Sequence, residues 1–290
     1  MTDDAPTDES SPVEGPDLTA ETVMTVDDDR YGQQTVALVT GAASGIGRAV
    51  AVALAVNGCT VAATDVDAEG LTGTVERAAE LGSAGNVHQI EGDLTEADDI
   101  ERIVEEAATL GELRFLANVA GLQHVAPLEE FPAEQYDRMQ RVMLRAPTLL
   151  AKHAFPHLRE AGGGAVGNMA SIHGHYTTSD KVAYNVCKFG IRGLTQSLAA
   201  EGDGDVRAFS VSTGYVSTPL VTDQIPETAA QRGITEREVV EDVMLGQSRT
   251  TRMMSPVEVA NLFVFGFSRH ASHLNGGDLL FDGGMATTYE

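Results

Sequence analysis

Three side chains, Ser171, Tyr184 and Lys188, have types and spacing suited to moving a proton. They lie in the stretch NMASIHGHYTTSDKVAYNVCKFG, and Tyr184 and Lys188 are four residues apart, so both fall on one face of a helix. An ammonium beside a phenol favours the phenolate, so we expect Lys188 to lower the pKa of Tyr184 below its usual value of about 10. Ser171 adds a hydroxyl to hold a substrate oxygen. The same spacing also occurs on ordinary helices, so the pattern needs support from elsewhere in the chain.

That support comes from a glycine-rich turn near the beginning of the sequence. The run Thr35–Thr40 is apolar and β-branched, as in a buried strand, and an alanine- and valine-rich helical segment follows over 45–57. Strand, glycine turn and helix in this order are typical of a site where backbone N–H groups approach a pyrophosphate. The residues expected to contact a dinucleotide here are Gly41, Ser44, Gly45, Ile46 and Gly47.

A second strand, Thr60–Thr64, ends at Asp65, which lies 18 residues after Gly47. A carboxylate at this position accepts hydrogen bonds from both hydroxyls of an adenine ribose and repels a 2′-phosphate, which favours NAD over NADP. Alternatively, Asp65 only caps the following helix, as Asp67 also could.

In this order, the motifs resemble the short-chain dehydrogenase/reductase family over about residues 34–284. The resemblance extends to EGDLT, LANVAG and STGYVSTPL. It implies that Asp93 and Leu94 hold the adenine, that Asn118, Ala120 and Gly121 close over the cofactor, and that Thr218 holds the nicotinamide carboxamide. The resemblance also implies that Tyr184 is the catalytic base and that Lys188 binds the nicotinamide ribose.

Two positions depart from the family pattern. Thr213 replaces the usual proline of the P-G-x-x-x-T segment, so this loop is less restricted. Met143, in RVMLRAP, replaces an asparagine that supports a proton-relay water in the family. The relay is therefore in doubt, unless a backbone carbonyl holds the water. Pro147, a few residues later, is expected to kink this helix.

Composition excludes several classes of protein. The net charge of −24 argues against partners such as nucleic acid or anionic membranes, and no run is long and apolar enough to span a membrane. Two cysteines, Cys59 and Cys187, indicate a reducing compartment without a disulfide framework. The acidic N-terminus is unlike a signal peptide. We therefore expect a cytoplasmic protein, and no spacing of ligand residues indicates a metal site.

Residues 1–33 contain ten acidic residues and a single basic one, Arg30. Such a segment has too little apolar area to fold alone, so we expect a disordered acidic extension followed by one catalytic domain over 34–290. The excess of acid remains in the folded part, and the whole chain has only three lysines, Lys152, Lys181 and Lys188. This composition is typical of a salt-adapted, halophilic-type surface.

The remaining sequence alternates strands and helices, which predicts an α/β fold with a doubly wound parallel sheet of the Rossmann type. Further strands are expected at Val87–Glu91, Phe115–Asn118, Ala165–Ala170, Arg207–Thr213 and Leu279–Phe281. Further helices are expected over 68–81, 96–110, 133–160, 178–201 and 256–267. Residues 219–250 break the alternation and are expected to form a helical, polar and mobile substrate lid.

Four segments lie around the expected site: GLQHVAPLEEFP, SIHGH, SDKVAY and TPLVTDQI. Together they resemble the D-3-hydroxybutyrate dehydrogenases more closely than the broad family. The resemblance implies that a substrate carboxylate is held by Gln123, His173, Lys181 and Gln224. The chemistry is consistent, because a small carboxylate needs a cation and several donors to offset its desolvation. Each residue also has a structural alternative: Gln123 as a loop cap, His173 as a core histidine, Lys181 as a solvated cation and Gln224 as an ordinary lid residue.

The expected reaction is NAD-dependent oxidation of D-3-hydroxybutyrate to acetoacetate by hydride transfer. One alternative is a dehydrogenase acting on another alcohol, a sugar, a polyol or a 3-hydroxyacyl thioester. A second alternative is a nucleotide-binding protein without catalysis, favoured only by Met143. Family analogy suggests a homo-oligomer, commonly a tetramer.

Overall fold

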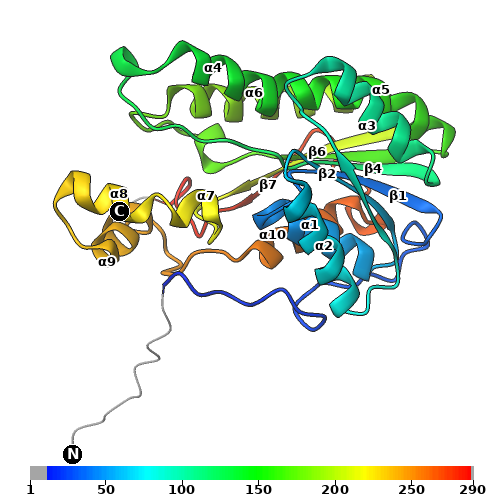
Figure 1. Cartoon of the computed structure of the whole chain (residues 1–290), viewed down its shortest axis with the longest axis horizontal. Coiled ribbons are helices and arrows are strands. Elements are labelled where there is room, and N and C mark those ends of the chain that lie inside the picture. Colours follow the sequence, from blue (N-terminus) through cyan, green and yellow to red (C-terminus); the bar gives the residue numbers. More distant parts are fainter. Residues whose placement is uncertain (1–11, 289–290) are drawn as a thin grey trace, which may run out of the picture.

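Seven parallel strands form the central sheet of the computed structural model, which describes residues 12–288 (Figure 1). The strand order is β3-β2-β1-β4-β5-β6-β7. The strands are β1 Thr35–Thr40, β2 Thr60–Asp65, β3 Val87–Glu91, β4 Glu112–Asn118, β5 Gly164–Met169, β6 Val206–Thr213 and β7 Asp278–Phe281. This architecture confirms the predicted doubly wound α/β fold.

The order of the strands reverses between β1 and β4. From β1 the chain adds strands outward to β3, and then returns to the other side of β1 to build β4 through β7. At such a switch point the segments leaving the two central strands diverge, which opens a crevice at their carboxyl ends. The fold therefore places its ligand site beside the residues that follow β1 and β4.

Helices cover both faces of this sheet. Figure 1 shows α1, α2 and α10 against one face and α3 to α6 against the other. These helices are α1 Gly45–Val56, α2 Ala68–Glu80, α3 Ala97–Ala108, α4 Ala133–Gln140, α5 Ala146–Glu160, α6 Val182–Glu201 and α10 Pro256–Phe267. Short turns are η1 Leu128–Glu130, η3 Ile172–Gly174 and η5 Arg269–Ala271.

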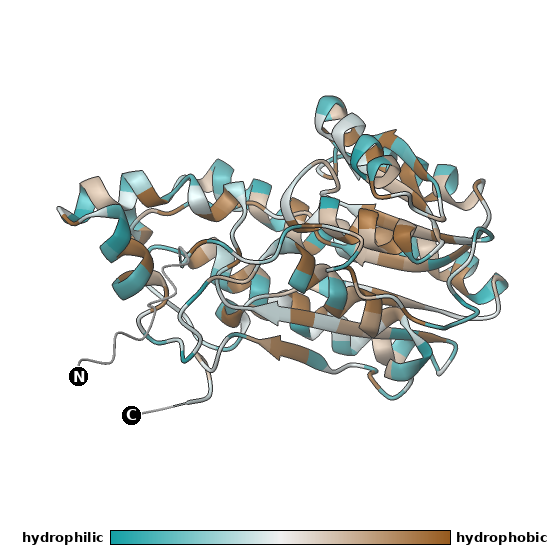
Figure 2. Ribbon diagram, turned by 90° about the horizontal axis from the view of Figure 1, so that it is seen from below, coloured by the Kyte–Doolittle hydropathy of each residue, from teal (hydrophilic) through white to brown (hydrophobic). Residues whose placement is uncertain are grey.

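The apolar pattern of the sequence explains these layers. All residues of β1 and β6 are buried, as expected for strands covered on both faces. In α3 the buried residues Ile100, Ile103, Val104 and Ala107 follow helical spacing, whereas Asp98 and Asp99 occupy its first turn. Figure 2 shows the hydrophobic segments gathered in the sheet and hydrophilic ones on the outer surfaces of the helices.

The helix expected over 133–160 is interrupted. The π-helical turn η2, Arg141–Arg145, separates α4 from α5, and Pro147 lies in the first turn of α5. The N–H of Ala146 donates to the carbonyl of Arg141, five residues earlier, so the hydrogen-bond pattern changes just before the proline, which has no N–H to donate. The irregularity therefore lies just before Pro147 and includes Met143.

The segment over 219–250, expected to act as a substrate lid, is helical. It contains α7 Pro219–Thr222, α8 Ile225–Arg232, α9 Glu236–Glu238 and the π turn η4 Val239–Met244. In contrast to the expected polar character, it has a small apolar cluster of its own, formed by Ile225, Ala229, Val239, Val240, Met244, Leu245 and Met253. In Figure 1 these helices lie to one side of the main layers.

The expectation of a disordered extension over 1–33 does not hold for residues 12–33, and residues 1–11 lie outside the described part of the chain. Val23 and Tyr31 are buried, and the Tyr31 hydroxyl donates to the carbonyl of Val264 at 2.6 Å. The buried Asp28 carboxylate accepts from the N–H of Arg269 at 2.5 Å. A few apolar anchors and backbone contacts to α10 and its following turn therefore hold this segment against the body, although it is too acidic to fold alone.

Candidate active site

The glycine turn between β1 and α1 borders a cavity of about 360 Å³ at the switch point of the sheet. Gly41 has φ +69°, in the left-handed region that favours glycine, and a Cβ there would lie 2.8 Å from the Cα of Ala120. This close approach brings the segments after β1 and β4 together. The N–H groups at the beginning of α1 therefore face a site suited to an anionic group.

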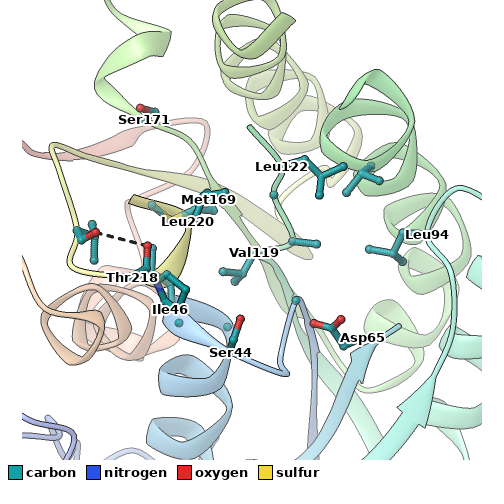
Figure 3. A pocket seen from close by; sticks show the side chains of 18 of the residues that line it. Ser44, Ile46, Asp65, Leu94, Val119, Leu122, Met169, Ser171, Thr218 and Leu220 are labelled. Atoms are coloured by element: carbon teal, nitrogen blue, oxygen red, sulfur yellow. Dashed lines mark hydrogen bonds between the residues drawn. The ribbon is translucent and has the colours of Figure 1, made fainter. Parts of the chain in front are cut away.

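Most of the predicted cofactor-binding residues line this one cavity. Figure 3 shows Asp65 and Leu94 on one side of it and Ser171 on the other, with Ser44, Ile46 and Thr218 between them. The predicted residues that line it are Gly41, Ser44, Gly45, Ile46, Gly47, Asp65, Asp93, Leu94, Ala120, Gly121, Ser171, Tyr184, Lys188 and Thr218.

Asn118 is the exception, since it is not part of the cavity lining. Its side chain is 4% exposed, and its Nδ2 donates to Oδ1 of Asn168 at 2.8 Å. Asn168 in turn donates to Oγ1 of Thr195 at 2.9 Å. Asn118 therefore links β4 to β5 and α6 within the sheet, a position that the strand pattern alone does not distinguish from its neighbours at the strand end.

The carboxylate of Asp65 lies at the end of β2, partly buried beside the glycine turn. It accepts hydrogen bonds from the N–H groups of Ala43 at 3.1 Å and Asp67 at 3.2 Å. The capping of α2 belongs to Asp67, whose side chain accepts from the N–H of Gly70 at 3.0 Å. The structure thus separates the two aspartates and leaves Asp65 facing the cavity.

Ser171, Tyr184 and Lys188 come together from two elements. Ser171 follows β5, and the other two lie one turn apart on α6. The Lys188 ammonium donates to the carbonyl of Met169 at 2.7 Å and lies 5.4 Å from the centroid of the Tyr184 ring. The sequence-based grouping is therefore reproduced in space, beside the glycine turn.

The expected effect of Lys188 on Tyr184 is not found. Although Tyr184 is only partly buried, its withdrawal from water raises its pKa to about 12, and hydrogen bonding with Ser171 acts in the opposite direction. Burial also lowers the pKa of Lys188 to about 8. Desolvation outweighs the attraction that the spacing suggested, because both groups lie inside the protein. At neutral pH the phenol therefore holds its proton.

Two of the four residues predicted to hold a carboxylate are joined by a hydrogen bond. Gln123 donates from Nε2 to Oε1 of Gln224 at 3.1 Å. Gln224 also donates to the carbonyl of Leu220. Leu220 lines the cavity, and so does Leu122, the residue before Gln123. The amide pair therefore joins the loop after β4 to the beginning of the lid, at the border of the cavity.

Lys181 and His173 are near enough for their charges to interact but share no hydrogen bond, and neither lines the cavity itself. Lys181 is partly buried at the beginning of α6, with its ammonium 5.8 Å from the centroid of the Tyr215 ring, and burial lowers its pKa. The pKa of His173 falls to about 4, first because of burial and then because of repulsion from Lys181 and Lys188. Lys181 thus supplies a cation near Tyr184, whereas both ring nitrogens of the neutral His173 imidazole have hydroxyl partners, Ser171 at 3.5 Å and Thr178 at 3.1 Å.

Met143 occupies a buried position in η2, where its sulfur accepts from the N–H of Leu122 at 3.4 Å. It packs with Met139, Ala183 and Cys187. Since a thioether has no exchangeable proton, this position cannot supply the polar group that the family pattern has there.

Several cavity residues were not identified from the sequence. They are mostly apolar residues directly after the strands, where position at a strand end is the available signal. Arg138, on α4, is the exposed cation among them. The set is Val66, Gly92, Thr95, Val119, Leu122, Arg138, Val142, Met169, Ala170, Thr213, Gly214, Val216, Pro219, Leu220 and Val221. Thr218 donates to the carbonyl of Val216 at 3.4 Å, the contact drawn in Figure 3.

Within residues 12–288 there is no group of three or more His, Cys, Asp or Glu side chains arranged to hold a metal ion. The same part of the chain has no helix with the length and apolar character needed to cross a membrane.

Comparison with known proteins covers nearly all of this structure. The family model described as enoyl-(acyl carrier protein) reductase matches residues 41–286. A D-beta-hydroxybutyrate dehydrogenase of Rhizobium meliloti (strain 1021) is 36% identical over 250 residues, which is 86% of this chain and 97% of that protein. A D-threitol dehydrogenase of Mycolicibacterium smegmatis is 36% identical over 265 residues, which is 90% of this chain and 96% of that protein.

Solved structures agree with these sequence matches. The L-sorbose reductase from Gluconobacter frateurii, solved with NADPH and L-sorbose, has a TM-score of 0.82 and 27% sequence identity, and the match covers 89% of this chain and 99% of that one. The matched region contains the glycine turn, Ser171 and the α6 residues Tyr184 and Lys188. The chain is therefore an oxidoreductase of the short-chain dehydrogenase/reductase family, with a site for a nicotinamide dinucleotide.

Proposed function

We propose that this protein oxidises D-3-hydroxybutyrate to acetoacetate with NAD, and reduces acetoacetate in the reverse direction. The observation that carries the proposal is the position of Ser171, Tyr184 and Lys188, which line the same cavity as the glycine turn. A proton-transferring phenol and a dinucleotide site then share one space, as hydride transfer coupled to proton transfer requires.

The residues present suit a dinucleotide. The beginning of α1 offers N–H groups and the positive end of the helix dipole to a pyrophosphate. The Asp65 carboxylate supports NAD rather than NADP, because it accepts hydrogen bonds from ribose hydroxyls and repels a 2′-phosphate. When bound, the oxidised nicotinamide supplies the acceptor for the hydride from C3 of the substrate.

The protein side chains handle the proton. In the oxidation direction Tyr184 accepts the substrate hydroxyl proton as a phenolate, while the Ser171 hydroxyl holds the same oxygen as it becomes a ketone. Lys188 remains largely cationic below its pKa of about 8, and its charge, 5.4 Å from the Tyr184 ring, attracts the phenolate, although desolvation of Tyr184 outweighs this attraction. In the reduction direction the phenol of Tyr184 donates its proton to the new alkoxide.

The carboxylate of the substrate is assigned to Lys181, Gln123 and Gln224. Lys181 provides a positive charge that is partly withdrawn from water, and a desolvated cation attracts an anion more strongly than a solvated one. The two amides lie together at the border of the cavity, between the loop after β4 and the lid. His173 was expected in this set, but both of its ring nitrogens already have hydroxyl partners, so we do not assign it to the carboxylate.

A polyol is the second candidate substrate. The D-threitol dehydrogenase of Mycolicibacterium smegmatis is as similar to this chain as the hydroxybutyrate enzyme of Rhizobium meliloti, at 36% identity for each. For an uncharged polyol the charge of Lys181 would have no partner, so the role of Lys181 separates the two candidates.

The test is NADH formation from D- and L-3-hydroxybutyrate and from D-threitol, each with NAD and with NADP. We expect turnover of D-3-hydroxybutyrate with NAD, and its loss in Tyr184→Phe while NAD binding measured by calorimetry is retained. Turnover confined to D-threitol would replace the proposed substrate, and full activity of Tyr184→Phe would remove Tyr184 as the base.

Three further features are proposed. We place the enzyme in the cytoplasm, consistent with two free, buried cysteines. The exposed Val186 and Phe189 on α6 support a homo-oligomer, a tetramer by family analogy, which light scattering would test. The net charge of −24 supports function at high salt, and activity that falls steadily toward molar salt would contradict this.

A further inference from the structure

Both ring nitrogens of His173 lie beside hydroxyl groups. Nε2 is 3.1 Å from Oγ1 of Thr178, and Nδ1 is 3.5 Å from Oγ of Ser171. Ser171 and His173 are 6% and 5% exposed, whereas Thr178 lies at the surface. Three side chains in a row therefore connect solvent to the serine beside Tyr184.

The row is held from several sides. The His173 ring packs edge-on against the Tyr184 ring, with centroids 5.7 Å apart, and is 5.6 Å from the Tyr176 ring. The backbone N–H of His173 donates to Oγ of Ser171 at 3.2 Å. Asn185, next to Tyr184 on α6, donates to the carbonyl of Thr178 at 2.9 Å. Thr178 is therefore fixed in place although its side chain is exposed.

The number of hydrogens available decides the direction of these bonds. Ser171 has one hydroxyl hydrogen, and its hydrogen bond with Tyr184 lowers the pKa of that phenol, as donation toward the phenolate does. When Tyr184 is the phenolate that oxidation requires, it has no hydrogen to give, so Ser171 donates to it. The Ser171 oxygen can then only accept from His173, and Nδ1 must carry a hydrogen. Because the pKa of His173 is lowered to about 4, the ring is neutral and has a single N–H. Its Nε2 must then accept the hydroxyl hydrogen of Thr178.

We propose that Thr178 is a positioning residue: it fixes the Nδ1–H tautomer of His173, and so keeps the Ser171 hydroxyl as a donor toward the reacting oxygen. The tautomer of a histidine is set by the hydrogen bond at its other nitrogen. Without the Thr178 hydroxyl, water can accept from an Nε2–H, and Nδ1 then accepts the Ser171 hydrogen. That hydrogen would point away from the reaction. The inference rests on the proposed role of Ser171 and Tyr184 in oxidising an alcohol.

The tautomer can be measured directly. In protein labelled with 15N-histidine, two-bond 1H–15N correlation spectra distinguish the nitrogen that carries the proton, and a His173→Asn variant identifies the His173 signals. We expect the Nδ1–H form in the wild type and in Thr178→Ser, and a shift toward the Nε2–H form in Thr178→Val. An Nε2–H form in the wild type would overturn the proposal.

Kinetics provide the second measurement. Loss of one neutral hydrogen bond is expected to lower kcat of Thr178→Val by about five- to tenfold, with KM changed less than about twofold. Thr178→Ser should restore the rate, since it keeps the hydroxyl. Thr177→Val is the matched control, because Thr177 is the exposed neighbour and takes no part in the row; its kinetics and histidine spectrum should equal those of the wild type.

The two measurements separate the inference from the proposed function. Unchanged kcat in Thr178→Val overturns the positioning role, and so does a rise in KM alone, which would indicate a substrate contact. If the wild type oxidises another alcohol, the same comparison is made with that alcohol. If it oxidises none, the proposed function fails, while the wild-type tautomer and its response to Thr178→Val still decide the inference.

Discussion

The side-chain amide of Gln123 donates to that of Gln224 at 3.1 Å, although the two residues are 101 positions apart in the chain. Gln123 belongs to the loop after β4, and Gln224 directly precedes α8 of the lid. One hydrogen bond therefore joins the loop at the switch point to the helical segment proposed as the lid. Because each amide retains further donor and acceptor capacity, a carboxylate can be held between them.

Gln224→Ala should raise KM for D-3-hydroxybutyrate about tenfold, because a hydrogen bond to a charged group contributes about 1.5–3 kcal/mol. KM for NAD should stay within about twofold of the wild type, since Gln224 is not part of the cavity lining. Gln231→Ala is the control, because Gln231 is exposed on the helix that follows Gln224 and its side-chain amide donates to Glu227. An unchanged KM for the hydroxy acid would place the carboxylate elsewhere.

Lys181→Met should raise KM for the hydroxy acid more than Gln224→Ala does, by about 10- to 100-fold, and should lower kcat as the substrate loses its orientation. Methionine keeps the length and apolar part of the side chain, so the change isolates the charge. Steady-state kinetics should be compared with Lys152→Met, which removes a charge from the exposed surface of α5. Equal effects of the two variants would mean that net charge, and not a carboxylate contact, is being measured.

Asp65→Ser should change cofactor preference. Without the carboxylate, repulsion of a 2′-phosphate disappears, and kcat/KM with NADP should rise about tenfold or more while that with NAD falls by a similar factor. Asp67 remains to cap α2, so the fold should be kept. Glu69→Gln, which removes an exposed charge in the first turn of α2, is the control and should leave both values unchanged. A wild-type enzyme that already prefers NADP would contradict the role given to Asp65.

Local patterns in the sequence were sufficient for the sheet, the helices and the grouping around Tyr184. Strands such as Thr35–Thr40 are marked by apolar, β-branched runs, and the end of each parallel strand indicates the site. What the sequence could not supply depends on tertiary contacts. The pKa of Tyr184 follows from burial, the position of Asn118 follows from its partner Asn168, and the packing of residues 12–33 follows from anchors such as Tyr31.

Oxidation and reduction should depend differently on pH. Burial, with smaller contributions from Tyr215 and Cys187, raises the pKa of Tyr184 to about 12. At any pH below this value, an increase of one pH unit therefore raises the fraction of phenolate, which oxidation needs, about tenfold. The kcat/KM for oxidation should therefore rise from pH 6 to 8, and more slowly above about 8, where Lys188 loses its charge. Reduction of acetoacetate, which needs the phenol, should not rise over this range.

Measurement of both rates in one buffer series tests this expectation. The variant Tyr176→Phe is a suitable control, because Tyr176 also has a pKa raised to about 12 but does not line the cavity. In Tyr176→Phe, kcat/KM for oxidation should rise with pH as steeply as in the wild type. A plateau of the oxidation rate between pH 6 and 7 would show that Tyr184 ionises far more easily than its burial implies.

Lys188 is expected to limit stability while it serves the reaction. Its pKa falls from 10.5 to about 8 on folding. Since each unit of pKa change corresponds to about 1.4 kcal/mol, the charged Lys188 side chain lowers the free energy of unfolding by about 3 kcal/mol at neutral pH. Between pH 8 and 10.5 the unfolded chain binds more protons at this position than the folded one, so the penalty disappears as pH rises. The ammonium also donates to the Met169 carbonyl at 2.7 Å, which offsets part of the penalty.

Lys188→Met should therefore abolish turnover and yet raise the free energy of unfolding by about 1–2 kcal/mol at pH 7, measured with urea. At pH 10 the gain should vanish, because the wild-type side chain is then neutral in the folded state. Lys152→Met, at an exposed position, should change stability at neither pH. A less stable Lys188→Met at pH 7 would mean that the hydrogen bond to Met169 outweighs the desolvation of the charge, and that the ammonium supports the fold as well as the reaction.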